Sequence, residues 1–242
     1  MPRKSQTESI ADENAAPGGA AAVDRALSLL GAFSQGDRAL SLAVLAERTR
    51  LYKSTVLRLL ASLEHAGFVQ RLADGRYALG PEIARLHTLY AASFSLEEQV
   101  VPVLRSLVDA TGESAAYHVL QGQARLCLYR VDSPQPIRDH IRAGDLLPLG
   151  RGSGGRVIAA YGPPAADQSA EDRLLYERIR NQGYYAASGD RLAGVAGISA
   201  PVLHANGALA GAVTLTMPAT RYTDAHIPCV LRAAATLARA LG

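Results

Sequence analysis

Apolar residues recur at helical spacing through the first third of the chain, and short turn signals separate the runs. A first helix is predicted over residues 23–33, and Ser41 offers an N-cap for a short second helix. The segment 51–66 predicts a third helix, and two short strands flank Asp74-Gly75, which is a hairpin signal. This order of elements is the pattern of a winged helix-turn-helix.

The third of these helices has two unlike faces. Its apolar stripe consists of Val56, Leu59, Leu60 and Leu63. The opposite face carries Ser54, Thr55 and Arg58, and Lys53 precedes them. Free N–H groups, hydroxyls and cations at one helix N-terminus suit the phosphates and base edges of DNA. In the alternative interpretation Ser54 only caps a buried helix, which leaves the other three polar side chains unexplained.

From residue 113 onward the apolar pattern changes to a period of two. Alternating runs flank a Gln-Gly turn at Gly122 and an Asn-Gly turn at Gly207, and both turns predict hairpins. Helical patterns lie between these runs, and a last helix is expected over residues 224–241. Antiparallel strands with helices on their faces indicate an α+β domain.

These patterns divide the chain into four parts. Residues 1–21 form a Pro-, Gly- and Ala-rich arm that we expect to be disordered, without the apolar core of a signal peptide. A winged helix-turn-helix domain is expected at 22–80, a linker helix at 81–94 and an α+β domain at 95–242. The expected fold class is therefore α+β with two domains.

Composition limits where the chain works. No run of 18 residues is free of polar or charged interruptions, so we expect no membrane partner. The two cysteines, Cys127 and Cys229, lie far apart and neither belongs to a CxxC motif, so no disulfide framework is expected. A reduced, cytoplasmic location follows from this cysteine usage.

Positive charge gathers in the first domain. Residues 38–80 hold seven Lys or Arg against three acids, whereas residues 81–242 hold fifteen against fourteen. The surplus of cations therefore coincides with the helix-turn-helix pattern, where an electrostatic footprint for nucleic acid would lie. A solvated charged surface is the alternative explanation.

A glycine-rich helix start lies in the second domain at residues 150–155. Glycines allow close approach to the backbone, and the N–H groups of a helix start attract anions such as carboxylates. A flexible loop that merely begins a helix explains the same residues equally well. Asp190 leaves two interpretations open as well, a contact with a bound ligand, or a loop cap or ion pair with Arg191 or a more distant arginine.

An enzyme is the weaker alternative. His118 and Cys127 fall on neighbouring predicted strands and could act as base and nucleophile, but no third, orienting residue is evident. Strand cysteines are usually packing residues, so no catalytic residue is expected. The six histidines form no HxxxH motif or acidic cluster, so we expect neither a metal nor a cofactor.

Most of the chain, from Ala22 to the C-terminus, resembles the IclR (isocitrate lyase regulator) family of bacterial transcription factors. The resemblance is carried by "SLAVLAERTRLYKSTVLRLLASLEHAGFV", "GDLLPLGRGSGGRVIAAY" and "GVAGISAPVLHANGALAGAVTLTMPATR". It implies a GAF/profilin-like effector-binding domain and a homodimer, often paired into a homotetramer. It also implies that an effector controls binding to double-stranded operator DNA, commonly beside a catabolic operon.

The expected DNA contacts are Ser41, Arg50, Tyr52, Lys53, Ser54, Thr55, Arg58, Arg71 and Arg76. Side chains near the start of the third helix are expected on base edges and nearby phosphates, and Arg71 and Arg76 on a groove beside the wing. Arg3 and Lys4 in the arm would add non-specific charge. A GAF-like sensor that acts only through protein contacts is the remaining alternative, and it would not need this charge.

The resemblance further implies an effector pocket lined by Leu149, Gly155, Ala187, Gly197, Thr214 and Thr216. Thr214 and Thr216 alternate along one strand, so both hydroxyls can face one cavity. Ala187 stands where an acid is found in a glyoxylate-type pocket, and Gly197 replaces a cysteine. These small residues suggest a roomier, less polar pocket and an aromatic or larger organic acid as the effector.

Overall fold

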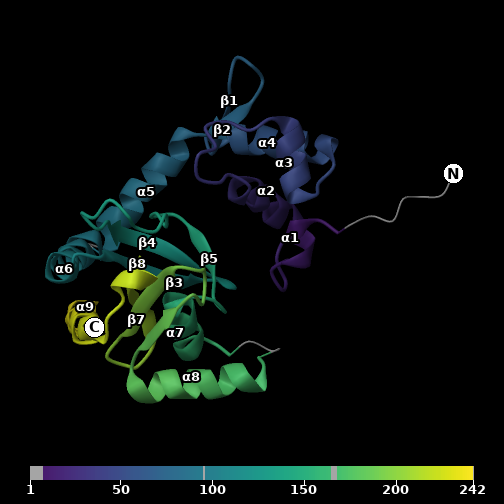
Figure 1. The fold of residues 1–242 in the computed structure, drawn as a ribbon. Helices are drawn as coiled ribbons and strands as arrows, with labels where there is room; N and C mark the ends of the chain where they lie inside the picture. Colours follow the sequence, from purple (N-terminus) through teal and green to yellow (C-terminus); the bar gives the residue numbers. More distant parts are fainter. Residues whose placement is uncertain (1–7, 95, 165–167, 242) are drawn as a thin grey trace. The chain divides into compact units, whose positions relative to one another are not determined.

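The computed structural model describes residues 8–94, 96–164 and 168–241. The chain divides into two compact units, residues 1–93 and residues 94–242 (Figure 1). Within the described ranges no helix is both long and apolar enough to span a bilayer.

The first unit is a small helical domain with a two-stranded wing. Its elements are α1 (Ile10–Glu13), α2 (Ala21–Gly31), α3 (Leu42–Thr49), α4 (Lys53–His65), β1 (Val69–Arg71), β2 (Tyr77–Leu79) and α5 (Pro81–Phe94). Fully buried Leu29, Leu45 and Val56 join α2, α3 and α4 in one core. Tyr77 extends this core into the wing and pairs through its backbone with Leu40.

Local sequence explains the helix ends of this unit. The Ser41 hydroxyl accepts a hydrogen bond from the Val44 N–H at 3.3 Å and caps α3, as predicted. Arg50 ends α3 in the left-handed region at φ 56°, which is uncommon for a residue with a Cβ. Gly67 and Gly75 also have positive φ values, at the end of α4 and in the wing turn.

The N-terminal arm differs from the prediction of disorder. Ser9 caps the single turn α1, and Ala11 is buried. Asp12 pairs with Arg25 of α2 at 2.9 Å. These contacts need the folded α2, which is why composition alone did not indicate them. Arg3 and Lys4 lie outside the described residues.

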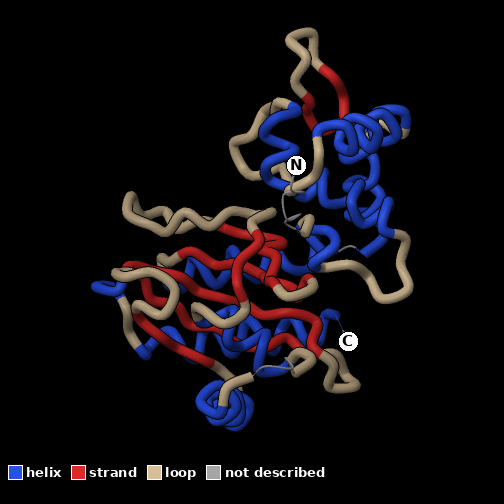
Figure 2. The backbone as a smooth tube through the Cα atoms, turned by 90° about the vertical axis from the view of Figure 1, so that its right-hand side faces the viewer, coloured by secondary structure: helices blue, strands red, loops and turns tan. Residues whose placement is uncertain are grey.

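The second unit contains a six-stranded antiparallel sheet. Its elements are α6 (Leu96–Thr111), β3 (Ser114–Gln121), β4 (Ala124–Val131), β5 (Leu146–Pro148), α7 (Ser153–Tyr161), α8 (Ala170–Gln182), β6 (Tyr185–Ser188), β7 (Val195–Leu203), β8 (Leu209–Pro218), and α9 (Ile227–Leu241) after two short 3₁₀ turns. The strand order is β5-β4-β3-β8-β7-β6, and Figure 2 shows these strands side by side in red. The hairpins turn at Gly122 and Gly207, as their turn signals predicted.

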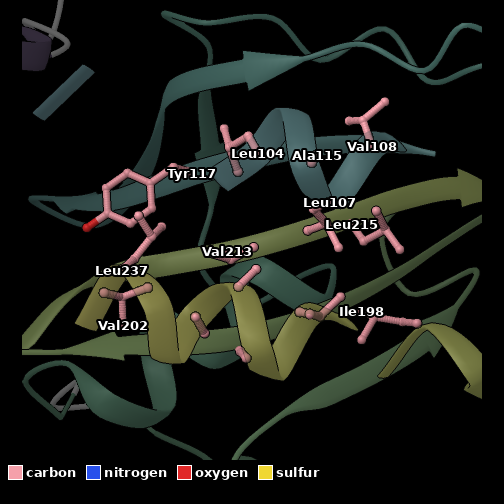
Figure 3. Close-up of a cluster of buried hydrophobic side chains, with 14 of the residues drawn as sticks. Leu104, Leu107, Val108, Ala115, Tyr117, Ile198, Val202, Val213, Leu215 and Leu237 are labelled. Carbon is pink, nitrogen blue, oxygen red and sulfur yellow. The ribbon is translucent and has the colours of Figure 1, made fainter. Parts of the chain in front are cut away.

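Helices cover both faces of this sheet (Figure 1). On one face α6 and α9 bury the main core, in which Leu104, Leu107 and Leu237 project toward the strands (Figure 3). On the other face α7 and α8 pack through Ile158 and Ile179. The glycine-rich start of α7 therefore lies against the sheet, where it forms one wall of a cavity.

Candidate functional site

The first turn of α4 presents its polar side chains to solvent. Val56 and Leu60 are buried, whereas Lys53, Ser54 and Arg58 are exposed. Tyr52 occupies the N-cap position without a side-chain cap, and Ser54 lies inside the helix. The interpretation of Ser54 as a simple cap is therefore wrong, and the polar face is available to a partner.

Several cations that the sequence assigns to DNA have partners in this unit. Arg50 pairs with Glu13 of α1 at 2.5 Å, and Arg76 pairs with Asp74 at 2.7 Å. The Arg71 guanidinium lies 5.9 Å from the centre of the Tyr77 ring. Such exposed pairs contribute little stability, so a phosphate can replace the carboxylate partners. By contrast, Lys53 and Arg58 form no ion pair with any residue that the structure describes.

The second unit holds a small cavity of about 20 Å³ between the sheet and the start of α7. A cavity of this size admits roughly one water molecule. Its walls are Arg125, Ile141, Gly152, Ser153, Ala187, Asp190, Arg191, Val195, Ala196, Gly197, Thr214 and Thr216.

The guanidinium of Arg125 is a buried cation in the wall of this cavity. The residue is only 2% exposed, and neither Nε nor Nη1 has a hydrogen-bond acceptor among the described residues. Burial, together with the charge of nearby Arg191, lowers the pKa of Arg125 to about 10. A side chain at position 154 would overlap Nη1 and would lie 2.6 Å from the Thr214 hydroxyl. Glycine at 154 is therefore what lets α7 start beside this cation.

The start of α7 is held by a carboxylate and by a row of hydroxyls. Asp190 accepts a hydrogen bond from the Gly152 N–H at 2.8 Å, and Arg156 Nε lies 3.5 Å from the same oxygen. The Ser199 hydroxyl links the hydroxyls of Ser153 and Thr214 at 2.8 and 2.9 Å. Of the interpretations left open for Asp190, the loop cap paired with a distant arginine matches these contacts.

The predicted effector residues divide into two groups. Ala187, Gly197, Thr214 and Thr216 line the cavity, whereas Leu149 and Gly155 do not. A Cβ at position 155 would lie 2.5 Å from the carbonyl oxygen of Leu149, so these two residues shape the loop behind the cavity.

The expectation of a roomier pocket is not met by a cavity of about 20 Å³. A Cβ at Gly197 would lie 2.5 Å from the Ser153 hydroxyl, and Gly154 makes room for Arg125. Polar groups from other segments thus fill the space that the small residues leave.

Sequence reasoning missed Arg125, Ile141 and Arg191 as cavity residues. The one signal for Arg125 was its place two residues before Cys127 in an alternating strand, on the face that the buried cysteine shares. Ile141 and Arg191 come from loops, and no periodic pattern points to them.

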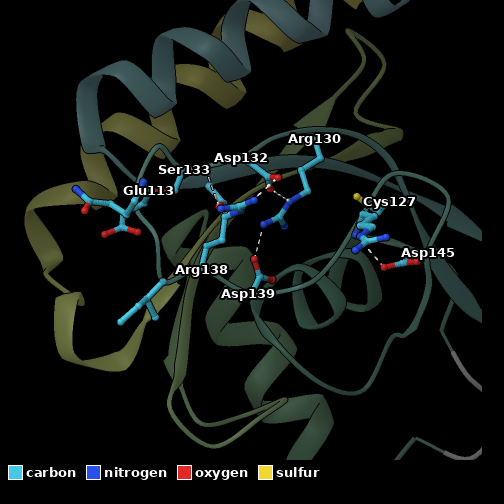
Figure 4. Close-up of polar contacts among 12 residues, drawn as sticks. Glu113, Cys127, Arg130, Asp132, Ser133, Arg138, Asp139 and Asp145 are labelled. Atoms are coloured by element: carbon cyan, nitrogen blue, oxygen red, sulfur yellow. Dashed lines mark hydrogen bonds and ion pairs between the residues drawn. The ribbon is translucent and has the colours of Figure 1, made fainter. Parts of the chain in front are cut away.

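A strap over residues 132–145 borders the cavity through Ile141. Arg130 pairs with the buried Asp139 and with Asp132, as the dashed lines in Figure 4 show. Arg191 Nη2 lies 3.5 Å from Asp139 Oδ2, an ion pair without a hydrogen bond. These contacts fix the strap so that Ile141 is buried against the cavity.

The His118 and Cys127 pair lacks the chemistry of a nucleophile and base. The two residues pair across β3 and β4, and both are fully buried. Burial raises the pKa of the Cys127 thiol to about 12. Burial, and then the charges of Arg125, Arg130 and Arg191, lower the pKa of His118 well below 6.5. Across the ranges that the structure covers, no group of three potential metal ligands occurs.

Comparison with known proteins assigns both units. The IclR helix-turn-helix domain matches residues 22–73, and the Bacterial transcriptional regulator IclR C-terminal domain matches residues 88–176 and 171–242. The Glycerol operon regulatory protein of Streptomyces coelicolor is 31% identical over 211 residues, 80% of this chain and 83% of that protein. The regulator BhcR of Paracoccus denitrificans is 28% identical over 93% of this chain and 87% of its own length.

Solved structures agree with this assignment. An IclR-type transcriptional regulator from Silicibacter sp. TM1040 superposes with a TM-score of 0.81 at 25% identity, covering 91% of this chain and 96% of that one. An IclR homologue from Microbacterium hydrocarbonoxydans has the same fold, with a TM-score of 0.76 at 20% identity over 91% of this chain and 98% of that one. The chain therefore belongs to the IclR family of DNA-binding bacterial transcriptional regulators, and it is not an enzyme.

Proposed function

We propose that this regulator docks α4 in the major groove of its operator and that an organic acid, bound in the cavity of the second unit, controls its operator affinity. It would act in the cytoplasm as a homodimer or homotetramer on a neighbouring catabolic operon. The observation that carries the DNA part is the exposed Lys53, Ser54 and Arg58 face of α4, opposite buried Val56 and Leu60. A GAF-like sensor that acts through protein contacts would not require this exposed cationic face.

The remaining polar residues fit the same docking. Tyr52 and Thr55 flank the α4 start and would reach base edges or nearby phosphates. Ser41 caps α3. The free N–H groups at the start of α3, together with Arg50, would contact the DNA backbone. Arg71 and Arg76 lie on the exposed surface of the wing and would follow an adjacent groove.

Arg58→Ala tests the docking. If Arg58 contacts a base edge, the specific operator affinity falls by about 1–3 kcal/mol while binding to random duplex changes little. If it contacts only phosphate, both affinities fall together and the salt dependence becomes shallower. Fluorescence anisotropy with labelled duplexes over a salt series distinguishes these outcomes.

Arg173→Ala is the matched control, because Arg173 is an exposed arginine on α8 of the other unit. Equal losses for the two variants, or no loss for Arg58→Ala, would leave α4 without a DNA-binding role.

The effector part is supported by the cavity and by one relative. The Microbacterium hydrocarbonoxydans homologue was crystallised with 4-hydroxybenzoate, an aromatic acid, and shares the fold of the second unit. Control requires that the acid bind the DNA-competent and incompetent states with different affinity, and a coupling of about 1–3 kcal/mol is typical. Operator titrations with and without organic acids, aromatic acids included, measure this coupling directly.

A further inference from the structure

We propose that Arg125 is the anion-recognition residue of the cavity and that the effector is a short monocarboxylate whose carboxylate binds this guanidinium. The inference rests on the proposed effector control and adds the recognising residue and the size of the ligand. It stands on three observations, which concern the cation, the surrounding carboxylates and the space.

The first observation is the buried cation itself. Arg125 projects from β4 into the cavity and is 2% exposed, and its Nε and Nη1 find no acceptor in the described part of the chain. Burying a charge without a partner costs several kcal/mol, so proteins normally pair such groups. The planar fork of a guanidinium matches a carboxylate through two parallel hydrogen bonds.

The second observation is that the nearby carboxylates are already used. Asp139 pairs with Arg130 and Arg191, and Asp190 holds the Gly152 N–H beside Arg156. Neither forms a hydrogen bond or an ion pair with Arg125. A carboxylate from outside the chain would therefore complete the charge balance of this cavity.

The wall beside Arg125, at the start of α7, offers donors to the same anion. The first N–H groups of a helix have no partner within the helix, and those of α7 lie at Ser153 and Gly154, beside Arg125. The Thr216 hydroxyl completes this wall from β8. A carboxylate bound at Arg125 would thus lie next to the N-terminus of α7 as well.

The third observation is the space. The cavity of about 20 Å³ is bounded by Arg125 and by the strap through Ile141. Any acid must displace some of these side chains, and a short acid displaces fewer of them than a benzoate ring does. The size of the cavity therefore favours short acids over aromatic ones.

Isothermal titration calorimetry of the full chain tests the proposal. The probes are acetate, pyruvate, acetamide, inorganic phosphate and 4-hydroxybenzoate. We expect a short carboxylate to bind, its uncharged analogue acetamide not to bind, and Arg125→Met to weaken carboxylate binding by about 10- to 100-fold. Arg125→Lys keeps the positive charge but cannot form two parallel hydrogen bonds. Its carboxylate affinity should therefore lie between those of the wild type and Arg125→Met. Arg173→Gln, which removes an exposed cation on α8, should bind as the wild type does.

A thermal melt separates recognition from a structural role. Removing an unpaired buried charge should leave the melting temperature of ligand-free Arg125→Met equal to or above that of the wild type. A lower melting temperature would assign Arg125 to the core and overturn the proposal. So would unchanged carboxylate binding in Arg125→Met, or wild-type binding of phosphate or 4-hydroxybenzoate without any short carboxylate.

Failure of this inference and failure of the proposed function are distinguishable. If an acid changes operator affinity and Arg125→Met responds to it as the wild type does, only the role of Arg125 is lost. If no acid binds or alters operator affinity, effector control fails as well, and the Arg58→Ala titration still reports on DNA binding.

Discussion

His118 shows what a single buried side chain imposes on this protein. It lies on β3 against Cys127 of β4 and Ala212 of β8, and neither ring nitrogen has a hydrogen-bond partner among the described residues. The charges that act on it are those of Arg125, Arg130 and Arg191, all cations. The folded protein therefore holds the imidazole neutral, and any proton on it meets both desolvation and like charge.

The lowered pKa of His118 predicts a pH dependence of stability. Since its folded-state pKa lies below the ordinary value of 6.5, the unfolded chain takes up the proton first as the pH falls. Stability is therefore fully present above about pH 6.5 and is lost as the pH falls below it, toward the folded-state pKa. Urea unfolding followed by circular dichroism between pH 8 and 5 measures this loss.

His118→Gln keeps a polar side chain of similar size and removes the titration. We expect its free energy of unfolding to vary less over the same pH range, whatever its absolute value. An identical pH profile in both proteins would show that His118 is not the group responsible.

At the scale of elements, α4 serves folding with one face and binding with the other. Leu60 is 1% exposed in the core that α4 shares with α2 and α3, whereas Leu57 of the same helix is 45% exposed. The winged helix-turn-helix could be predicted because such faces repeat every three or four residues. The ion-pair partners of the cations could not be predicted from sequence. The contact of Arg50 with Glu13, for example, joins residues that are far apart in the chain.

Two leucine truncations on this helix test the division. Leu60→Ala should lower the free energy of unfolding of the first unit by about 2–5 kcal/mol, because it leaves a cavity in the core. Leu57→Ala should change it by less than about 0.5 kcal/mol. Circular dichroism in urea reports both, and the chain contains no tryptophan for a fluorescence assay. Similar losses for the two variants would mean that Leu57 is also packed.

At the scale of the whole molecule, one DNA-binding unit is too small for a selective regulator. A single module of this kind buries about 600–1,000 Å² against DNA, and two-fold symmetric dimers gain selectivity by reading two half-sites. The proposed dimer is therefore tied to the proposed function, since each subunit supplies one α4.

The dimer predicts the layout of the operator. Footprinting should show two half-sites separated by one helical turn, about 10 base pairs, or by a multiple of it. Inserting half a turn between them should weaken binding far more than inserting a full turn, because it rotates one half-site away from its subunit. Equal effects of the two insertions, or a single protected half-site, would contradict a symmetric dimer.

Sequence alone determined the two-domain architecture, the winged helix-turn-helix and the antiparallel sheet. These features rest on local signals, namely apolar periodicity, the Ser41 cap and the glycine turns, and each was found where it was expected. The polar face of α4 was equally readable, because neighbouring turns of one helix place Ser54 and Arg58 on the same surface.

Only the tertiary structure decided the character of the cavity. Its walls come from β4, the strap, the start of α7 and the strands β7 and β8, which are distant in sequence. Gly197 was expected to leave space in the pocket, yet the Ser153 hydroxyl lies against it from another element, and Arg125 lies against Gly154 in the same way. Whether a small residue leaves a void depends on what packs opposite it, and that is settled by long-range contacts and not by the local pattern.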